Sequence, residues 1–135
     1  MMPEALIRYG LREALENYCA NLTISGGIQV QLQTYGMEER LEQSTEIVLY
    51  RIVQELLNNV IRHARAGHVL VQLIRKQDRF SLTVEDDGVG FDSNDCRMGA
   101  GIANVKARAE YLGGVVDIHS APGQGTSVNV EGDCL

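Results

Sequence analysis

The sequence predicts an α/β protein whose sheet is mixed or mostly antiparallel. Segments that alternate apolar and polar residues, as half-buried strands do, are interspersed with segments whose apolar residues recur at helical spacing. Strand segments also occur in neighbouring pairs joined by short turns, a pattern that antiparallel hairpins allow. The predicted order is helix, strand, helix, strand, strand, loop, helix, strand, strand.

The first half of the chain should contain two helices and one strand. An amphipathic helix is expected over residues 6–20, starting near Gly10 and broken by the SGG segment at 25–27. The segment IQVQLQTY, residues 28–35, alternates strictly and predicts a half-buried strand. Residues 44–66 then show helical spacing, with Ser44 or Thr45 as the N-cap and Gly67 as the stop.

The second half should supply four strands and one helix. Strands are expected at residues 69–74 and 80–85, followed by a polar, glycine-containing segment to residue 101. A helix is expected over residues 102–112, closed by two glycines. The segments VVDIHS and TSVNVEG, separated by APGQG, complete five strands and three helices.

Composition limits the class of protein. A chain of 135 residues with 44% hydrophobic and 22% charged residues suits one ordered domain. The net charge of −6 argues against a sequence-independent nucleic-acid binder. Three cysteines without CxxC spacing indicate reduced thiols of a cytoplasmic protein. No apolar run is long enough to cross a membrane, so we expect no membrane contact by this domain.

Polar residues form a line on the helix predicted over residues 44–66. Glu55, Asn59 and His63 recur at i, i+4 and i+8, and Arg62 lies beside them. A carboxylate, an amide and two nitrogen bases in one row are unusual on a half-buried helix. A solvated helix face with a Glu–His contact is the alternative, and from this helix alone it is the favoured interpretation.

A carboxylate should enter the inward face of the sheet where the segment VEDDGVGFD begins. Side chains alternate along a strand, so Asp86 shares its direction with Phe80, Leu82 and Val84. A buried carboxylate requires hydrogen-bond donors, and the amino group of a purine would be a suitable one. Glycines at 88 and 90 would let the backbone approach a flat ligand. A solvated turn is the alternative interpretation.

Two further segments complete the set of candidates. Gly99 and Gly101 precede a predicted helix, whose free backbone N–H groups attract phosphate. The alternative interpretation is that these glycines form a flexible linker before the helix. Thr126 follows the GQG turn and shares its direction with Val128 and Val130, so its hydroxyl is expected beside Asp86. The glycines do not follow a strand directly, and the chain has no Gly-Lys pair, which excludes a dinucleotide fingerprint and a P-loop.

Taken in order, these segments resemble a known family. QELLNNVIRHA, DDGVGF, GAGIANVKARAEYLGG and GQGT are similar to the N, G1, G2 and G3 boxes of the ATP-binding domain of bacterial sensor histidine kinases. The superfamily includes gyrase B, MutL-type repair proteins and the ninety-kilodalton heat-shock chaperones. The third segment is most similar to the subfamily paired with response regulators that carry a helix-turn-helix domain. The resemblance covers residues 6–130 and implies the two-layer Bergerat fold, with a five-stranded, mostly antiparallel sheet on one side and three helices on the other.

The resemblance implies roles for the helix residues. Asn59 would coordinate Mg²⁺ through its amide oxygen, a hard ligand that suits this ion. Glu55 would orient or deprotonate the attacking group, or its water. Arg62 and His63 would lie toward the phosphates of the nucleotide. Asn58 stands where we expect threonine.

The resemblance also implies an adenine pocket. Asp86 would accept a hydrogen of the adenine amino group, while Gly88 and Gly90 make room for the base. Thr126 would support Asp86 and an ordered water. Gly99 and Gly101 would hinge a lid over the phosphates.

The histidine that accepts phosphate in such kinases is not evident here. His63 belongs to the nucleotide box, and His68 and His119 lie in predicted strands. We therefore expect one catalytic domain over residues 1–135, with a core of about 6–131, taken from a longer kinase. The dimerisation and phosphoacceptor segment would lie upstream, and the parent protein could carry a membrane anchor.

The leading hypothesis is an ATP-dependent protein histidine kinase domain. It would bind ATP and Mg²⁺ and transfer the γ-phosphate to a histidine of the phosphoacceptor segment, acting indirectly on a response regulator. Two alternatives stay open, namely a non-catalytic nucleotide-dependent interaction module and an anti-sigma-factor-type serine kinase. Gyrase-like and chaperone ATPases are less favoured, because they carry longer lids and large additional domains.

Overall fold

The computed structural model describes residues 4–25, 27–90 and 99–133. They form four α-helices, one π-helical turn and five strands. In chain order these are α1 (Glu4–Tyr9), α2 (Leu11–Ser25), β1 (Gln29–Tyr35), α3 (Gln43–Asn59), η1 (Val60–Ala64), β2 (His68–Lys76), β3 (Arg79–Asp86), α4 (Gly99–Tyr111), β4 (Val115–Ser120) and β5 (Thr126–Asp133).

The five strands form one mixed sheet in the order β1-β2-β3-β5-β4. β1 and β2 are parallel, and every other neighbouring pair is antiparallel. A parallel pair needs a crossover connection, which α3 provides between β1 and β2. The predicted mixed, mostly antiparallel sheet is confirmed.

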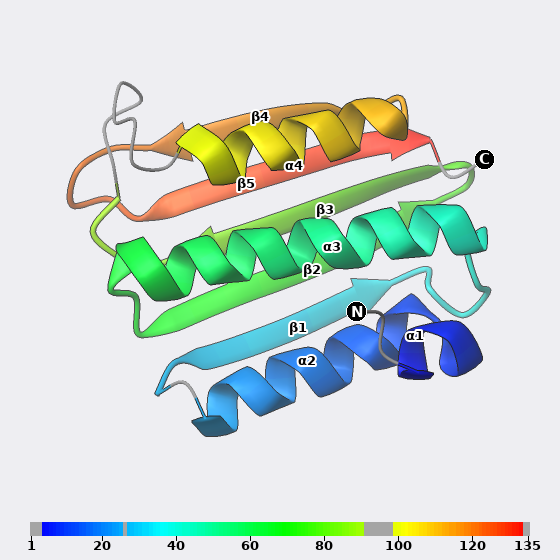
Figure 1. The fold of residues 1–135 in the computed structure, drawn as a ribbon, viewed down its shortest axis with the longest axis horizontal. Coiled ribbons are helices and arrows are strands. Elements are labelled where there is room, and N and C mark those ends of the chain that lie inside the picture. Colours follow the sequence, from blue (N-terminus) through cyan, green and yellow to red (C-terminus); the bar gives the residue numbers. More distant parts are fainter. Residues whose placement is uncertain (1–3, 26, 91–98, 134–135) are drawn as a thin grey trace.

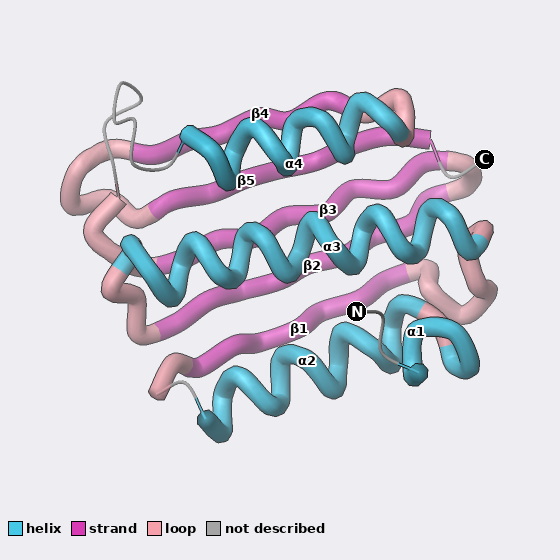
Figure 2. Tube along the Cα trace, viewed as in Figure 1, coloured by secondary structure: helices cyan, strands magenta, loops and turns pink. Residues whose placement is uncertain are grey.

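The helices cover one face of the sheet (Figures 1 and 2). Alternate residues of the central strands turn toward them and are fully buried, including Val71, Leu73 and Leu82. From the helix side, α3 contributes Leu49, Ile52 and other buried residues. One apolar core therefore lies between the two layers, as the two-layer fold requires.

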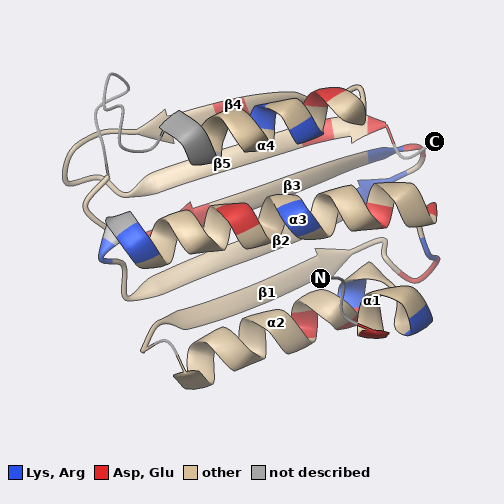
Figure 3. Cartoon of the chain, in the orientation of Figure 1, with Lys and Arg blue, Asp and Glu red and all other residues tan. Residues whose placement is uncertain are grey.

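The opposite face of the sheet is polar. Asn129 of β5 donates from Nδ2 to Ser81 Oγ at 3.0 Å and to Thr83 Oγ1 at 2.8 Å, both on β3. β1, with the sequence QVQLQTY, carries no charged residue (Figure 3). The strict alternation read from this segment is confirmed by exposed glutamines that alternate with half-buried residues.

Helix boundaries differ from the predictions in several places. The predicted first helix is two helices separated at Gly10, which raises the number of helices from three to four. The N-cap of α3 is Glu42, without a side-chain cap, rather than Ser44 or Thr45. Thr45 is instead buried.

The end of the long helix also differs. The α-helical hydrogen bonding stops at Asn59, and the chain continues as the π-helical turn η1 to Ala64. The stop is Arg65, in the left-handed region at φ 51°, rather than Gly67. A π-helix has more residues per turn, so the backbone between Asn59 and His63 does not have the α-helical spacing that the sequence predicted.

A buried carboxylate fastens α3 to the helices before it. Glu46 is 1% exposed and accepts hydrogen bonds from Arg40 Nη2 at 2.7 Å and from the Leu11 backbone N–H at 3.2 Å. The guanidinium of Arg40 also donates to the carbonyls of Leu6 and Ile7 at the end of α1. Both carboxylate oxygens therefore have partners inside the protein.

Candidate functional site

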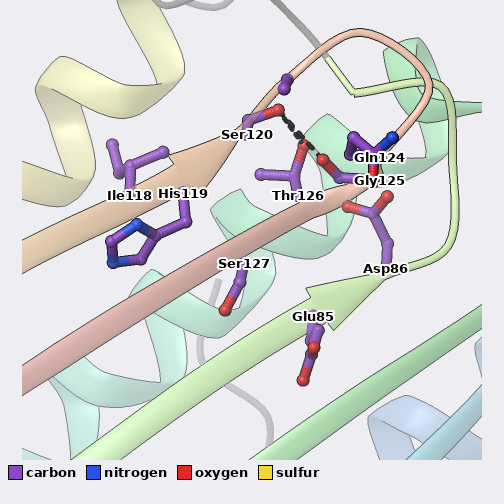
Figure 4. Close-up of a pocket in the computed structure, with 10 residues that line it drawn as sticks. Glu85, Asp86, Ile118, His119, Ser120, Gln124, Gly125, Thr126 and Ser127 are labelled. Carbon is purple, nitrogen blue, oxygen red and sulfur yellow. Dashed lines mark hydrogen bonds between the residues drawn. The ribbon is translucent and has the colours of Figure 1, made fainter.

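The sheet ends in a buried carboxylate at the last residue of β3. Asp86 is 8% exposed and lies in register opposite Thr126 of β5. Glu85 and Asp87 are exposed. The predictions that Asp86 points inward and that Thr126 lies beside it are confirmed, and Glu85 points away from Asp86 (Figure 4). The exposure of Glu85 and Asp87 agrees with the prediction that the acidic neighbours do not share the direction of Asp86.

Burial raises the pKa of the Asp86 carboxyl above its ordinary value, and the charges of Asp87 and Glu85 act in the same direction. Hydrogen bonds from the backbone of Gly88 and Thr126 lower it by less. The Gly88 N–H donates to Asp86 Oδ1 at 2.8 Å. Asp86 is therefore a carboxylate that an additional donor would stabilise in its charged form.

Two glycine-containing turns meet beside this carboxylate. The Gly123 N–H donates to the Val89 carbonyl at 2.5 Å, which joins the turn after β3 to the turn between β4 and β5. Gly90 has φ 67°, and a Cβ there would collide with the carbonyl of Ala121. A Cβ at Gly125, φ 73°, would collide with the carbonyl of Asp86. Backbone packs directly on backbone here, so side chains at these positions are excluded.

Ser120 lies next to Thr126 at the end of β4. Its Oγ is 2.8 Å from Thr126 Oγ1 and donates to the Gly125 carbonyl at 3.1 Å (Figure 4). The sequence analysis did not identify Ser120. The register of the last hairpin could have predicted this contact, because Ser120 and Thr126 flank the APGQG turn and pair directly across it.

Asp87 fastens the turn after β3 to the start of β2. Its Oδ1 accepts from the backbone N–H groups of Gly67 and His68 at 2.9 Å each, and its Oδ2 is 2.9 Å from His68 Nδ1. These contacts lower the pKa of the Asp87 carboxyl, with the His68 backbone bond as the largest cause. The sequence analysis also missed this role.

The end of α3 carries the predicted metal-binding residue. Asn59 is 9% exposed, and its Nδ2 is buried with no hydrogen-bond partner among the residues that the structure describes. An unpaired buried amide is costly unless a ligand or water satisfies it. Glu55, one turn earlier, is half-buried. Arg62, on η1, is exposed, and the side chain of His63 lies outside what the structure describes.

Gly99 and Gly101 lie inside α4 rather than before it, as its first and third residues. A helix start still leaves its first N–H groups without partners in the helix. The lid that these two glycines were expected to hinge falls on residues 91–98, which lie outside the described residues. Since α4 begins and α3 and β3 end on the same side of the molecule, all four boxes gather there (Figure 1).

A hollow of about 490 Å³ opens beside Asp86. It lies at the ends of β3 and β4 and the start of β5 and is lined from both faces of the sheet. Asp86, Thr126 and Ser120 line it from one face, and Glu85, Ser127 and His119 from the other. Neither Asn59 nor Glu55 is among the described residues that line it. The structure brings Asp86 and Thr126 together, and a shared cavity with Asn59 stays a prediction.

The donor chemistry at the end of α3 fits Mg²⁺ held mainly by a nucleotide. Within the described ranges, no three His, Cys, Asp or Glu side chains gather into a metal site. Mg²⁺ commonly takes only one or two protein ligands and completes its shell with phosphates and waters. The buried amide of Asn59 suits this arrangement, because a 180° rotation exchanges its oxygen and nitrogen.

Comparison with known proteins decides the family. Residues 44–133, most of the chain, match the family described as histidine kinase-, DNA gyrase B- and HSP90-like ATPase. The chain belongs to this ATPase family.

Similar proteins include named sensor kinases. This ATPase-family domain is 34% identical over 125 residues to the signal transduction histidine-protein kinase/phosphatase DegS of Brevibacillus brevis, covering 92% of the chain and 32% of DegS. It is 33% identical over 134 residues to the sensor histidine kinase ComP of Bacillus subtilis, covering 97% of the chain and 17% of ComP. The chain thus spans a third or less of the length of these two relatives.

A solved structure shares the fold. The blue-light activated histidine kinase of Erythrobacter litoralis EL346 matches with a TM-score of 0.74 and 24% identity, over 92% of this chain and 42% of that one. In the part of the chain that the structure describes, no helix combines the length and apolarity of a membrane span.

Proposed function

We propose that this domain binds Mg²⁺–ATP and transfers the γ-phosphate to a histidine on a separate helical segment of a two-component kinase. One observation carries the proposal. Asp86 is a buried carboxylate at the edge of a hollow, and its burial raises its pKa, so a further hydrogen-bond donor would stabilise its charged form. The adenine amino group supplies such a donor, and the match to ATPases supports this ligand.

The base site is built from backbone and small side chains. Asp86 accepts from the amino group, Thr126 supports it, and the turn with Gly88 and Gly90 lets the flat base approach. Direct packing between the two glycine turns supports this role, because it fixes the backbone next to Asp86 and leaves no side chain there to block a flat base.

The phosphate end is assigned to α3, η1 and α4. Asn59 would hold the metal through its amide oxygen, and the ion would supply positive charge opposite the phosphates. Arg62 and His63 lie toward the phosphates, and Gly99 and Gly101 hinge the lid. The orphaned amide of Asn59 supports this assignment.

Transfer forms a bond between an imidazole nitrogen of the acceptor and the γ-phosphorus, and it breaks the bond from that phosphorus to the bridging oxygen of ADP. Glu55 orients the imidazole and takes its proton. Positioning and charge neutralisation supply most of the rate, because phosphoryl transfer leaves the protein little covalent chemistry to do. The acceptor segment, the response regulator and a cytoplasmic setting follow from the same proposal.

Nucleotide calorimetry with and without Mg²⁺ tests the metal assignment. Asn59→Ala should abolish the Mg²⁺-dependent part of ATP affinity and leave the fold intact. The neighbouring Asn58 is exposed and provides a matched control, so Asn58→Ala should retain that part. Equal Mg²⁺ dependence in both variants and the wild type would contradict the role of Asn59.

Phosphoryl transfer to a supplied histidine-bearing helical segment tests the activity. Transfer from labelled ATP that is lost in Asn59→Ala and Glu55→Ala supports the kinase. Tight ATP binding without transfer would instead indicate the non-catalytic interaction module. Label on a serine would indicate the anti-sigma-factor-type kinase.

A further inference from the structure

The turn that follows Asp86 is held by hydrogen bonds at two places. The side chains of Asp87 and Val89 are exposed, so core packing of these side chains does not fix the turn. The Val89 carbonyl accepts from the Gly123 N–H, which leads to the turn between β4 and β5. On the other side, Asp87 binds residues 67–68 at the start of β2. The backbone next to Asp86 is therefore tied to two different parts of the chain.

Asp87 holds residues 67–68 through both its side chain and its main chain. Its Oδ1 accepts from the backbone N–H groups of Gly67 and His68 at 2.9 Å each, and its Oδ2 is 2.9 Å from His68 Nδ1. Its own N–H donates to the His68 carbonyl at 3.2 Å. Hydrogen bonds to an ionised acceptor are stronger than those between neutral groups. We call this set of contacts the Asp87 clasp.

The clasp reaches the chain segment that leaves the helix of Asn59. Between α3 and Gly67 the chain has η1 and residues 65–66. The end of α3, the start of β2 and the end of β3 lie on the same side of the molecule (Figure 1). The clasp thus joins the residue next to Asp86 to the segment that follows the proposed phosphate end of the site.

We propose that Asp87 is a positioning residue that sets the spacing between the base site at Asp86 and the phosphate end at Asn59. It acts through the main chain of Gly67 and His68 and does not touch the nucleotide. This inference rests on the proposed function, since it concerns how one ligand is held at both ends of the same site. A ligand that contacts both ends loses affinity when the ends shift, whereas a ligand that contacts one end does not.

The charge of Asp87 acts on the site in the opposite direction. A negative charge near the site repels the phosphates of ATP, so its removal alone should strengthen ATP binding. Glu85 precedes Asp86 as Asp87 follows it, and it is also exposed. Glu85→Ala therefore removes a comparable charge without touching the clasp, which makes it the matched control.

The experiment measures the affinity of the purified chain for Mg²⁺–ATP by calorimetry and for adenosine by NMR titration. Asp87→Ala should lose about three- to ten-fold in ATP affinity, the value of one hydrogen bond, and less than about two-fold for adenosine. Asp87→Asn keeps an oxygen for both N–H groups, so it should bind ATP at least as tightly as the wild type. Glu85→Ala should not weaken ATP binding.

Three outcomes would overturn the proposal. Unchanged ATP affinity in Asp87→Ala would remove the positioning role, and an equal loss for ATP and adenosine would indicate damage confined to the base site. A loss in Asp87→Asn as large as that in Asp87→Ala would show that the accepted hydrogen bonds are not what matters. Failure of the wild type to bind both ATP and adenosine would instead refute the proposed function.

Amide hydrogen exchange tests the clasp without any ligand. In Asp87→Ala the N–H groups of residues 67–68 should exchange faster, and so should the Gly88 N–H, which donates to Asp86. The amide of Leu82, in the core of the sheet, reports global unfolding and should keep its wild-type rate. Unchanged exchange at Gly88 would show that the clasp does not hold the turn beside Asp86, and would overturn the proposal even in a chain that binds no nucleotide.

Discussion

Two buried carboxylates lie in different surroundings, and their partners differ in kind. Glu46, on α3 near its start, is 1% exposed and receives a guanidinium and a backbone N–H. Asp86, at the end of β3, is 8% exposed and receives backbone N–H groups, with no cation paired to it among the described residues. The first acid is satisfied by the protein itself.

The difference separates a structural acid from a binding acid. Burial of an acid is costly, and the hydrogen bonds that Glu46 accepts from Arg40 and from the Leu11 N–H offset this cost within the fold. These contacts also join α1, α2 and α3. Asp86 retains a raised pKa because its partners do not compensate for its desolvation. A buried acid with capacity left, beside a hollow, is a candidate for ligand recognition.

The largest expected effect is on stability and concerns Glu46. Glu46→Ala leaves the Leu11 N–H and the Arg40 guanidinium without their carboxylate, and should lower the free energy of unfolding by about 2–4 kcal/mol. Urea denaturation measures it. Glu39 is exposed, and Glu39→Ala should change the free energy of unfolding little. Equal effects of both variants would remove the distinction between the two acids.

The next effect is on binding and concerns Asp86. Asp86→Asn should reduce ATP affinity on the order of ten- to a hundred-fold, because a hydrogen bond to a charged acceptor is lost. A carboxyl with a raised pKa contributes stability at low pH that is lost as pH rises, so the ionised group costs stability at neutral pH. The ligand-free variant should therefore be at least as stable as the wild type by thermal melting. Unchanged ATP affinity by calorimetry would contradict the pocket.

The smallest effect concerns Asp87, which is exposed. Its pKa is lowered, so it contributes stability above its ordinary pKa of about 4, and that contribution is lost as pH falls below this value. Asp87→Ala should lower the melting temperature at pH 7 and have progressively less effect at lower pH. Asp87→Asn keeps an oxygen that can accept from the Gly67 and His68 N–H groups, so its melting temperature at pH 7 should lie between those of Asp87→Ala and the wild type. A pH-independent difference would contradict the ionic contribution.

The alternation of apolar and polar residues and their helical spacing were sufficient to predict the class of sheet and the inward direction of the Asp86 side chain. Side-chain direction in a strand depends only on parity, so the burial of Asp86 and its neighbour Thr126 could be predicted once the strands were assigned. The parallel pairing of β1 with β2 could not be predicted from the sequence, because it depends on where α3 returns the chain to the sheet.

Features set by single contacts escaped prediction. Apolar spacing does not distinguish an α-helix from one π-helical turn over five residues, so the change of helix type after Asn59 was not predicted. Arg65 adopts a left-handed conformation that glycine usually supplies, and the stop was therefore placed at Gly67. The burial of Glu46 depends on Arg40, a long-range partner with no periodic signal.

The crossover role of α3 has a mechanical consequence. Its two ends connect to neighbouring strands of one sheet through residues 36–42 and through η1 with residues 65–67, and these short connections limit how far the helix can move along its axis. They therefore also limit changes in the spacing between the acid at the strand end and the amide at the helix end. If such a domain swings toward its acceptor during signalling, it should travel as a rigid unit.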